Sequence, residues 1–230
     1  MNHPGEVVYL VDDDESIREA MAGLLEAISI TAVSFESAED FLKYERSDSA
    51  GCLVLDLQLP AMSGLDLQER LGRNPSLPII FLTGTGDIPS SVRAMKAGAI
   101  EFLTKPINKE QLVAAIRTAF ARDRENRQRE AHIADLQSRF SRLSAREREV
   151  LPLMVAGFLN KQSAAMLGIT EVTLQIHRGH IMRKMAATSF ADLVRMCVAI
   201  GIPDRAQDPP NASAVSALGS VSPHRGDGIE

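Results

Sequence analysis

The sequence predicts an α/β domain with a doubly wound, five-stranded parallel sheet, followed by a smaller all-α domain. Over residues 6 to about 118, short apolar runs alternate with amphipathic segments, which is typical of βα units around a parallel sheet. Residues 143–202 keep helical periodicity and lose every strand signal, which indicates a separate helical unit.

The predicted strands are five apolar runs, at residues 7–11, 30–35, 52–57, 78–82 and 100–103. The helices between them begin at recognisable positions. Asp14 starts the first helix, whose apolar residues between 17 and 28 keep a 3.6-residue spacing. Ser37 opens a capping box at the second helix. Three more helices are predicted at residues 65–71, 90–97 and 109–120.

Residues 121–142 are predicted to form a helical linker that continues the last helix of the α/β domain. The segment is rich in Arg, Glu, Gln and Ala and contains no Gly or Pro. One apolar stripe recurs at three- and four-residue steps, through Ile133, Leu136, Phe140 and Leu143. This stripe either packs against the chain's own domains or forms a short coiled coil between two chains.

The all-α domain, residues 143–202, is predicted to contain four helices, near residues 145–157, 160–167, 171–185 and 189–200. Ser144 begins a capping box with Glu147, and Gly157 and Gly168 separate neighbouring helices. Short helices joined by a glycine-containing turn favour a helix-turn-helix. Residues 203–230 are rich in Pro, Ser, Ala and Gly with few large apolar side chains, so we expect a disordered tail.

Polar side chains stand at the carboxyl ends of four predicted strands. Asp12 and Asp13 follow the first strand, and Asp56 lies at the end of the third. Thr83 follows the fourth strand, and Lys105 comes shortly after the fifth. Open α/β sheets bind their ligands at this edge, and a carboxylate at the end of a buried strand has no packing role. The pattern predicts a site where a carboxylate accepts a phosphoryl group with Mg²⁺ present.

The formal net charge of −5 conceals a difference between the two domains. Residues 6–118 carry 18 acidic and 10 basic side chains, whereas residues 143–202 carry 4 acidic and 7 basic ones. This split suits a cation in the first domain and a polyanion in the second.

Cys52 and Cys197 match no metal-ligand spacing and are expected to be reduced thiols of a cytoplasmic protein. No apolar run approaches the roughly 18 residues that span a bilayer, so no membrane partner is expected.

Two motifs carry a family resemblance in the α/β domain. One is residues 56–64, Asp-Leu-Gln-Leu-Pro-Ala-Met-Ser-Gly, and the other is Lys105-Pro106. On these motifs, residues 6–118 resemble the receiver domain of two-component response regulators. The resemblance implies a flavodoxin-like fold in which Asp56 attacks a phosphohistidine of a sensor histidine kinase.

The resemblance also implies a divalent cation, Mg²⁺ or Mn²⁺, because converging carboxylates repel each other unless a cation holds them ionised together. Its ligands would be Asp13, Asp56 and the main-chain carbonyl of Gln58, with Asp12 acting mostly through water.

Three further residues complete the implied site and its switch. Lys105 would pair with one phosphoryl oxygen, and the hydroxyl of Thr83 would donate to another. In receiver domains the residue at the place of Thr83 moves toward the phosphoryl group, and an aromatic side chain, here Phe102, turns inward behind it. Such a change is a population shift between two states rather than a new fold.

The helical domain resembles the LuxR-type helix-turn-helix of response regulators of the FixJ/NarL class. In such a module the third helix, here residues 171–185, lies in the major groove. The resemblance implies phosphate contacts from Lys161, Thr173, His177 and Lys184. It implies base contacts from Gln175, Ile176 and Arg178.

Four residues depart from the pattern of this module. Pro152 lies inside its first predicted helix and should kink it or remove a backbone hydrogen bond. Ser163 stands where the family usually has an aliphatic core residue, and Gln175 replaces a frequent Lys. Gly179 lies in the middle of a helix at a cost of roughly 1 kcal/mol. These residues either adjust DNA specificity or mark weak DNA binding that needs dimerisation.

The sequence therefore predicts a response regulator with a receiver domain (residues 1–120), a linker (121–142) and a DNA-binding domain (143–202). Phosphorylation is expected to promote homodimerisation and binding of double-stranded DNA, with RNA polymerase as a further candidate partner. One alternative is a phosphorylation-controlled protein-interaction module whose helix-turn-helix has lost DNA binding. An enzyme, an aspartyl-phosphate phosphatase, is disfavoured because Leu57-Gln58 follows Asp56 where such an enzyme has an Asp two residues after its nucleophile.

Overall fold

The computed structural model describes residues 5–47, 49–72, 77–84 and 88–202. The chain divides into two compact units, residues 1–130 and 131–230. The predicted disordered tail, residues 203–230, lies outside the described residues. The predicted domain boundaries stay a prediction. No helix within the described ranges is both long and apolar enough to cross a membrane.

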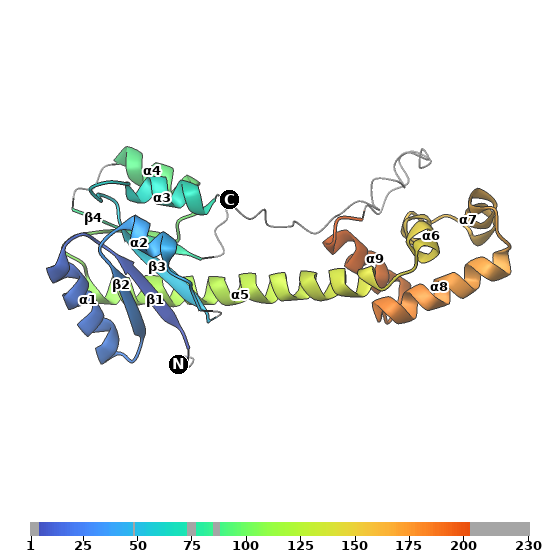
Figure 1. Cartoon of the computed structure of the whole chain (residues 1–230), viewed down its shortest axis with the longest axis horizontal. Helices are drawn as coiled ribbons and strands as arrows, with labels where there is room; N and C mark the ends of the chain where they lie inside the picture. The colour runs from blue at the N-terminus through green and yellow to red at the C-terminus, as the bar shows by residue number, and fades with distance from the viewer. Residues whose placement is uncertain (1–4, 48, 73–76, 85–87, 203–230) are drawn as a thin grey trace, which may run out of the picture. The chain divides into compact units, whose positions relative to one another are not determined.

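The first unit is a parallel sheet with helices on both faces (Figure 1). Its strands are β1 (Val7–Val11), β2 (Thr31–Phe35), β3 (Gly51–Asp56), β4 (Ile79–Thr83) and β5 (Glu101–Thr104). Its helices are α1 (Glu15–Ala27), α2 (Ala38–Lys43), α3 (Gly64–Leu71), α4 (Ile88–Lys96) and α5 (Lys109–Ser141). The spatial order of the strands is β2-β1-β3-β4-β5, which confirms the predicted doubly wound fold.

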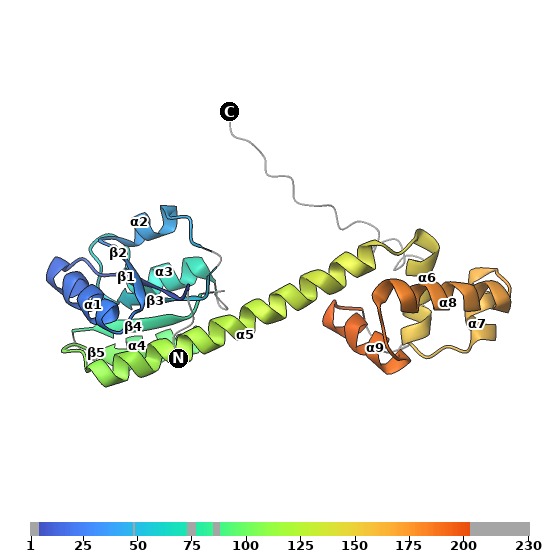
Figure 2. The same ribbon diagram turned by 90° about the horizontal axis from the view of Figure 1, so that it is seen from below.

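Two apolar layers cover the two faces of the sheet. Helices α1 and α5 pack on one face, and α2, α3 and α4 pack on the other (Figure 2). Every residue of β3 and β4 is buried, as expected for central strands of a parallel sheet covered on both sides. A polar side chain at the end of such a strand is therefore desolvated by its position alone.

Side-chain caps fix where the helices begin. The Asp14 carboxylate accepts a hydrogen bond from the Ser16 amide at 2.9 Å, and Ser37 accepts one from the Asp40 amide at 3.1 Å. Both predicted starts are confirmed. The start of α3 has a full capping box between Ser63 and Asp66, which was not predicted from the sequence.

Helix α5 is one continuous helix of 33 residues, so the linker does continue the last helix of the α/β fold. Buried Asp123 ties this helix to the sheet by accepting a hydrogen bond from the Gly51 amide of β3 at 2.9 Å, and it also accepts one from Arg127 of the same helix at 2.7 Å. Of the linker stripe, Leu136 is fully buried and Leu143 belongs to the core of the second unit. The coiled-coil alternative stays a prediction.

The second unit contains four further helices: α6 (Ala145–Val155), α7 (Asn160–Leu167), α8 (Glu171–Met185) and α9 (Phe190–Ala199). They enclose one apolar core. Helix α7 ends at Gly168, whose left-handed φ of 64° opens the turn to α8. Helix α6 continues through Pro152, so this proline removes one backbone donor without ending the helix. The predicted four-helix domain is confirmed.

Candidate functional site

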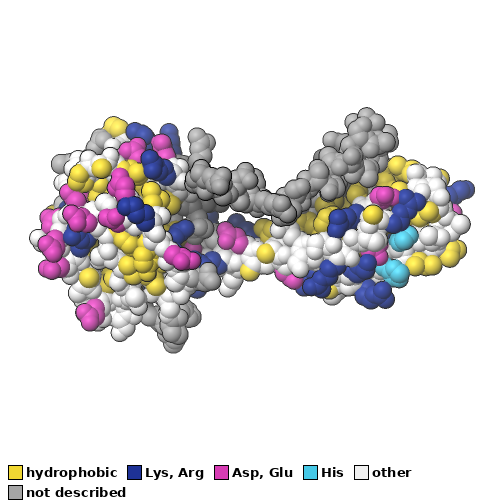
Figure 3. Space-filling view, viewed as in Figure 1, with side chains coloured by type: hydrophobic (Ala, Val, Ile, Leu, Met, Phe, Trp, Pro, Cys, Tyr) yellow, Lys and Arg dark blue, Asp and Glu magenta, His cyan; other side chains and the backbone are white. Residues whose placement is uncertain are grey.

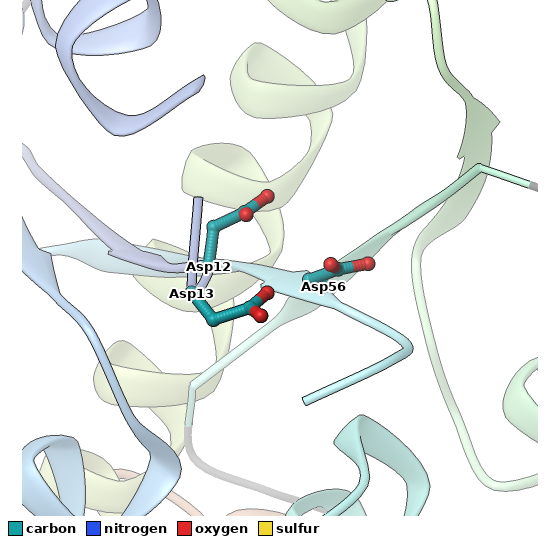
Figure 4. Close-up of side chains that lie close together, drawn as sticks. All are labelled: Asp12, Asp13 and Asp56. Carbon is teal, nitrogen blue, oxygen red and sulfur yellow. The ribbon is translucent and has the colours of Figure 1, made fainter. Parts of the chain in front are cut away.

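The carboxyl ends of β1 and β3 meet where the strand order reverses. The parallel register pairs Val11 with Leu55, which brings Asp12 beside Asp56. Asp12, Asp13 and Asp56 each offer an oxygen, and these oxygens lie within 4.8 Å of one another (Figure 4). Such crevices are the usual ligand sites of open α/β sheets.

Lys105 faces two of the three carboxylates. Its ammonium nitrogen lies 2.8 Å from Oδ2 of Asp12 and 3.1 Å from Oδ2 of Asp56. It reaches them from the segment after β5, because the Lys105 amide donates to the carbonyl of Thr83 at 2.7 Å. The peptide bond between Lys105 and Pro106 is cis. The sequence-predicted Asp12, Asp13, Asp56 and Lys105 therefore form one cluster.

The electrostatics of this cluster are incompletely compensated. Burial raises the pKa of the Asp56 carboxyl above its usual value, and the hydrogen bond from Lys105 offsets only part of that effect. Burial alone would lower the pKa of the Lys105 ammonium, but its hydrogen bonds to Asp12 and Asp56 outweigh burial and raise it. One lysine thus pairs with two acids of a cluster of three, which leaves excess negative charge for a cation.

The other predicted receiver residues lie around the cluster. Thr83 is fully buried at the end of β4 and pairs in register with Thr104. Phe102 on β5 is half-buried, with its ring centroid 6.2 Å from that of Phe81. The amide of Gln58 lies 3.4 Å from Oδ1 of Asp56. The roles assigned to Thr83, Phe102 and the Gln58 carbonyl stay predictions.

Gly64 supports the site through a close contact that was not predicted from the sequence. A Cβ at this position would lie 2.4 Å from the carbonyl oxygen of Asp56 and 3.0 Å from the ring of Phe81. The Gly64 amide also donates to the carbonyl of Leu57 at 3.0 Å. The first turn of α3 therefore packs directly on the main chain of Asp56, and only glycine fits at position 64.

In the second unit, α8 has one open face and one buried face. Val172, Gln175, Ile176, Gly179 and Arg183 are exposed, whereas Leu174, Ile181 and Met185 are buried. Of the predicted base-reading residues, Gln175 and Ile176 lie on the open face, and Arg178 is half-buried at its border. Val172 and Arg183 also lie on the open face, and neither was predicted from the sequence. Their helical spacing with Gln175 and Ile176 was the available signal.

The predicted phosphate-contacting residues differ in how far other groups already engage them. Lys161 on α7 is exposed, and His177 is half-buried. The hydroxyl of Thr173 lies 2.9 Å from that of Thr170, which caps α8. Lys184 forms a salt bridge with Glu147 at 2.6 Å. Figure 3 shows Lys, Arg and His side chains gathered on the visible surface of the helical domain.

Glu147 anchors α8 to α6. Its side chain is 3% exposed and meets Lys184, the Ser144 amide at 2.7 Å and His180 at 3.6 Å. Burial alone would raise the pKa of the Glu147 carboxyl, but the hydrogen bonds from Lys184 and Ser144 outweigh burial and lower it. The sequence identified Glu147 as a capping residue and missed its contacts with α8.

Two departures from the module's pattern have a structural context. Ser163 is 1% exposed, and its hydroxyl has no hydrogen-bond partner among the described residues. A Cβ added at Gly179 would meet nothing within 4 Å, so the fold does not require glycine there.

Comparison with known proteins identifies both units. A family model described as the response regulator receiver domain matches residues 8–117. A second, described as bacterial regulatory proteins of the luxR family, matches residues 141–197. The chain is 47% identical over 197 residues to nodulation protein W of Bradyrhizobium diazoefficiens, which covers 85% of this chain and 87% of that protein. The chain belongs to the response regulators with a LuxR-type DNA-binding domain.

Other members of the family support this assignment. The transcriptional regulatory protein FixJ of Azorhizobium caulinodans is 38% identical over 196 residues, covering 85% of this chain and 93% of that protein. The solved structure of the response regulator StyR superposes with a TM-score of 0.72 at 44% identity, covering 84% of this chain and 98% of that one. The α/β unit is the receiver domain, and the helical unit is the output domain.

Proposed function

We propose that this response regulator accepts a phosphoryl group on Asp56 from a phosphohistidine of a sensor histidine kinase. The observation that carries the proposal is the cluster of three carboxylates at the reversal of strand order, two of which, Asp12 and Asp56, pair with Lys105. One oxygen of Asp56 would attack phosphorus, and the phosphorus–nitrogen bond to the histidine would break. Lys105 would then pair with a phosphoryl oxygen, and the Thr83 hydroxyl would donate to another.

A divalent cation, Mg²⁺ or Mn²⁺, fits the donor set of the receiver site. Three carboxylate oxygens within 4.8 Å of one another are hard ligands of the kind that Mg²⁺ prefers. Asp13 and Asp56 would bind it directly with the Gln58 carbonyl, and Asp12 mostly through water. When bound, the cation supplies positive charge that neutralises the carboxylates and the incoming phosphoryl group.

Phosphorylation would shift the receiver between two states and so control the output domain. Thr83 and Phe102 would form the switch, because they lie on the neighbouring strands β4 and β5 beside the acids. The active state would be a homodimer whose paired output domains bind double-stranded DNA in the cytoplasm and contact RNA polymerase. Within each output domain, Lys161, Thr173, His177 and Lys184 would contact phosphates, and Gln175, Ile176 and Arg178 would read bases.

The phosphoryl site is tested by incubating the full-length chain with acetyl phosphate and Mg²⁺ and measuring its mass. Wild type should gain one phosphoryl group, which Asp56→Asn should abolish. The matched control is Asp40→Asn, which removes an exposed acid at the start of α2 and should leave the gain unchanged. Retention of the adduct by Asp56→Asn would place the acceptor elsewhere.

The DNA contact is tested by the salt dependence of duplex binding. Lys161→Ala should lower the slope of log affinity against log salt by about one unit on specific and shuffled duplexes alike, because one phosphate contact is lost. Lys184→Ala should do the same and also destabilise the output domain, since it breaks the contact with Glu147. Salt-independent binding would favour the protein-interaction alternative.

A further inference from the structure

Arg178 lies at the border of the open face of α8, beside the start of α9. Its guanidinium carbon is 5.8 Å from the ring centroid of Phe190, the first residue of α9. The cap at Ser189, which accepts from the Asp192 amide at 3.1 Å, fixes where α9 begins. Because 42% of Phe190 is exposed, this cation–π pair lies at the surface beside the face that would meet DNA.

A second pair of arginine and phenylalanine in the same domain shows what is particular about this one. Arg148 lies 5.5 Å from the ring of Phe140, and one of its amino groups donates to the carbonyl of Ser141 at 2.8 Å. Among the described residues, no carbonyl or carboxylate accepts a hydrogen bond from Arg178. The ring thus holds Arg178 while its donors stay available to a ligand with acceptors.

We propose that Phe190 is a positioning residue for DNA recognition, which holds the Arg178 guanidinium ready to bind a guanine edge. This inference rests on the proposed base reading by Arg178 and adds to it a residue from a different helix. The chemistry is consistent, because a guanidinium stacked on a ring keeps its planar fork of N–H donors for a bidentate contact.

The physical advantage lies in side-chain entropy. A free arginine loses much of its rotamer freedom when it docks on a base. An arginine already held by a ring has lost part of that freedom before DNA arrives, so the contact costs less. The benefit applies only where Arg178 meets its base, and a shuffled duplex should not show it.

The test is a double-mutant cycle on the full-length chain activated with beryllofluoride and Mg²⁺. The wild-type chain selects a duplex from a randomised library, and this duplex and a shuffled one of equal composition are the probes. Phe190→Leu should weaken the selected duplex about threefold, as loss of a surface cation–π contact would. Arg178→Ala should weaken it about tenfold or more. The double variant should match Arg178→Ala alone.

Two controls separate positioning from stability. Phe190→Tyr keeps an aromatic ring and should keep wild-type affinity for the selected duplex. Phe140→Leu disturbs the other arginine–ring pair and should lower thermal stability while leaving the ratio of the two affinities unchanged.

The outcomes separate this inference from the proposed function. Independent losses in the cycle, an equal loss on the shuffled duplex, or tighter binding by Phe190→Leu would overturn the role of Phe190 and leave DNA reading intact. Neutral Arg178→Ala, or failure of the wild type to enrich any duplex, would overturn the base reading and this inference with it.

Discussion

Asp56 in the receiver domain and Glu147 in the output domain are both buried carboxylates that face a lysine, yet their environments shift the carboxyl pKa in opposite directions. Burial raises the pKa of Asp56, and the contacts with Lys105 do not compensate. At Glu147 the hydrogen bonds from Lys184 and Ser144 overcome burial and lower the pKa. The difference shows that an ion pair alone does not mark a functional site. The informative feature is charge left uncompensated at a place that a ligand can reach.

The largest effect should come from breaking the compensated pair. Glu147→Gln removes the charge that accepts hydrogen bonds from Lys184 and from the Ser144 amide. It should lower the stability of the output domain by about 3 kcal/mol, because two charge-assisted hydrogen bonds of a buried carboxylate are weakened together. Asp56→Asn removes an acid from a repelling cluster and should raise the stability of the receiver domain.

The two domains can be followed separately during unfolding. Both tyrosines, Tyr9 and Tyr44, lie in the receiver domain, and the chain has no tryptophan. Tyrosine fluorescence therefore reports the receiver, while far-ultraviolet circular dichroism reports both domains. A loss of receiver stability in Asp56→Asn would contradict the inference that the ionised Asp56 carboxylate destabilises the receiver domain.

The pH dependence should sharpen the same comparison. Because the pKa of Glu147 is lower in the folded than in the unfolded chain, its ionised carboxylate stabilises the fold at pH values above the unfolded pKa. The stability lost in Glu147→Gln should therefore shrink as the pH falls below about 4.5. The pKa of Asp56 is raised in the folded chain, so its ionised carboxylate destabilises the fold. The stability gained in Asp56→Asn should therefore be largest near neutral pH and should vanish as the pH falls toward 3.8. Urea titrations between neutral pH and pH 4 measure the difference in unfolding free energy between each variant and wild type. If both variants differed from wild type in the same direction, the contrast between Asp56 and Glu147 would be wrong.

The next largest effect should come from Gly64→Ala, which separates the packing of the receiver site from its charges. The added Cβ would lie 2.4 Å from the Asp56 carbonyl oxygen, so strand or helix must shift, at a cost of about 2 kcal/mol. Phosphoryl uptake from acetyl phosphate should fall with it, although no charge has changed.

Gly23→Ala is the matched control for Gly64→Ala. Gly23 is an exposed position of α1 where a Cβ would meet nothing within 4 Å, and alanine should stabilise that helix by up to about 1 kcal/mol. Normal phosphoryl uptake by Gly64→Ala would show that the site tolerates the shift.

The sequence predicted the cluster of Asp12, Asp56 and Lys105 because parallel strands bring their carboxyl ends to one edge, whatever the details of packing. It could not predict the contact of Gly64 with Asp56, which depends on how closely α3 approaches β3. The partner of Lys184 was also missed, because Glu147 lies 37 residues away and only the packing of α6 on α8 joins them. Periodicity indicates which face a residue occupies, whereas its partner is set by tertiary structure.

The smallest effect should come from Ser163, which extends the comparison from charged to neutral polar groups. Its hydroxyl is buried without a partner among the described residues, so it bears a desolvation cost without a compensating hydrogen bond. Ser163→Ala should therefore stabilise the output domain by about 1 kcal/mol.

Ser189→Ala is the control, because it makes the same chemical change at the cap of α9, where the side chain accepts a hydrogen bond from the Asp192 amide. It should destabilise the output domain by about 1 kcal/mol. Circular dichroism unfolding should show shifts of opposite sign. Destabilisation by both substitutions would mean that the Ser163 hydroxyl has an acceptor in solution.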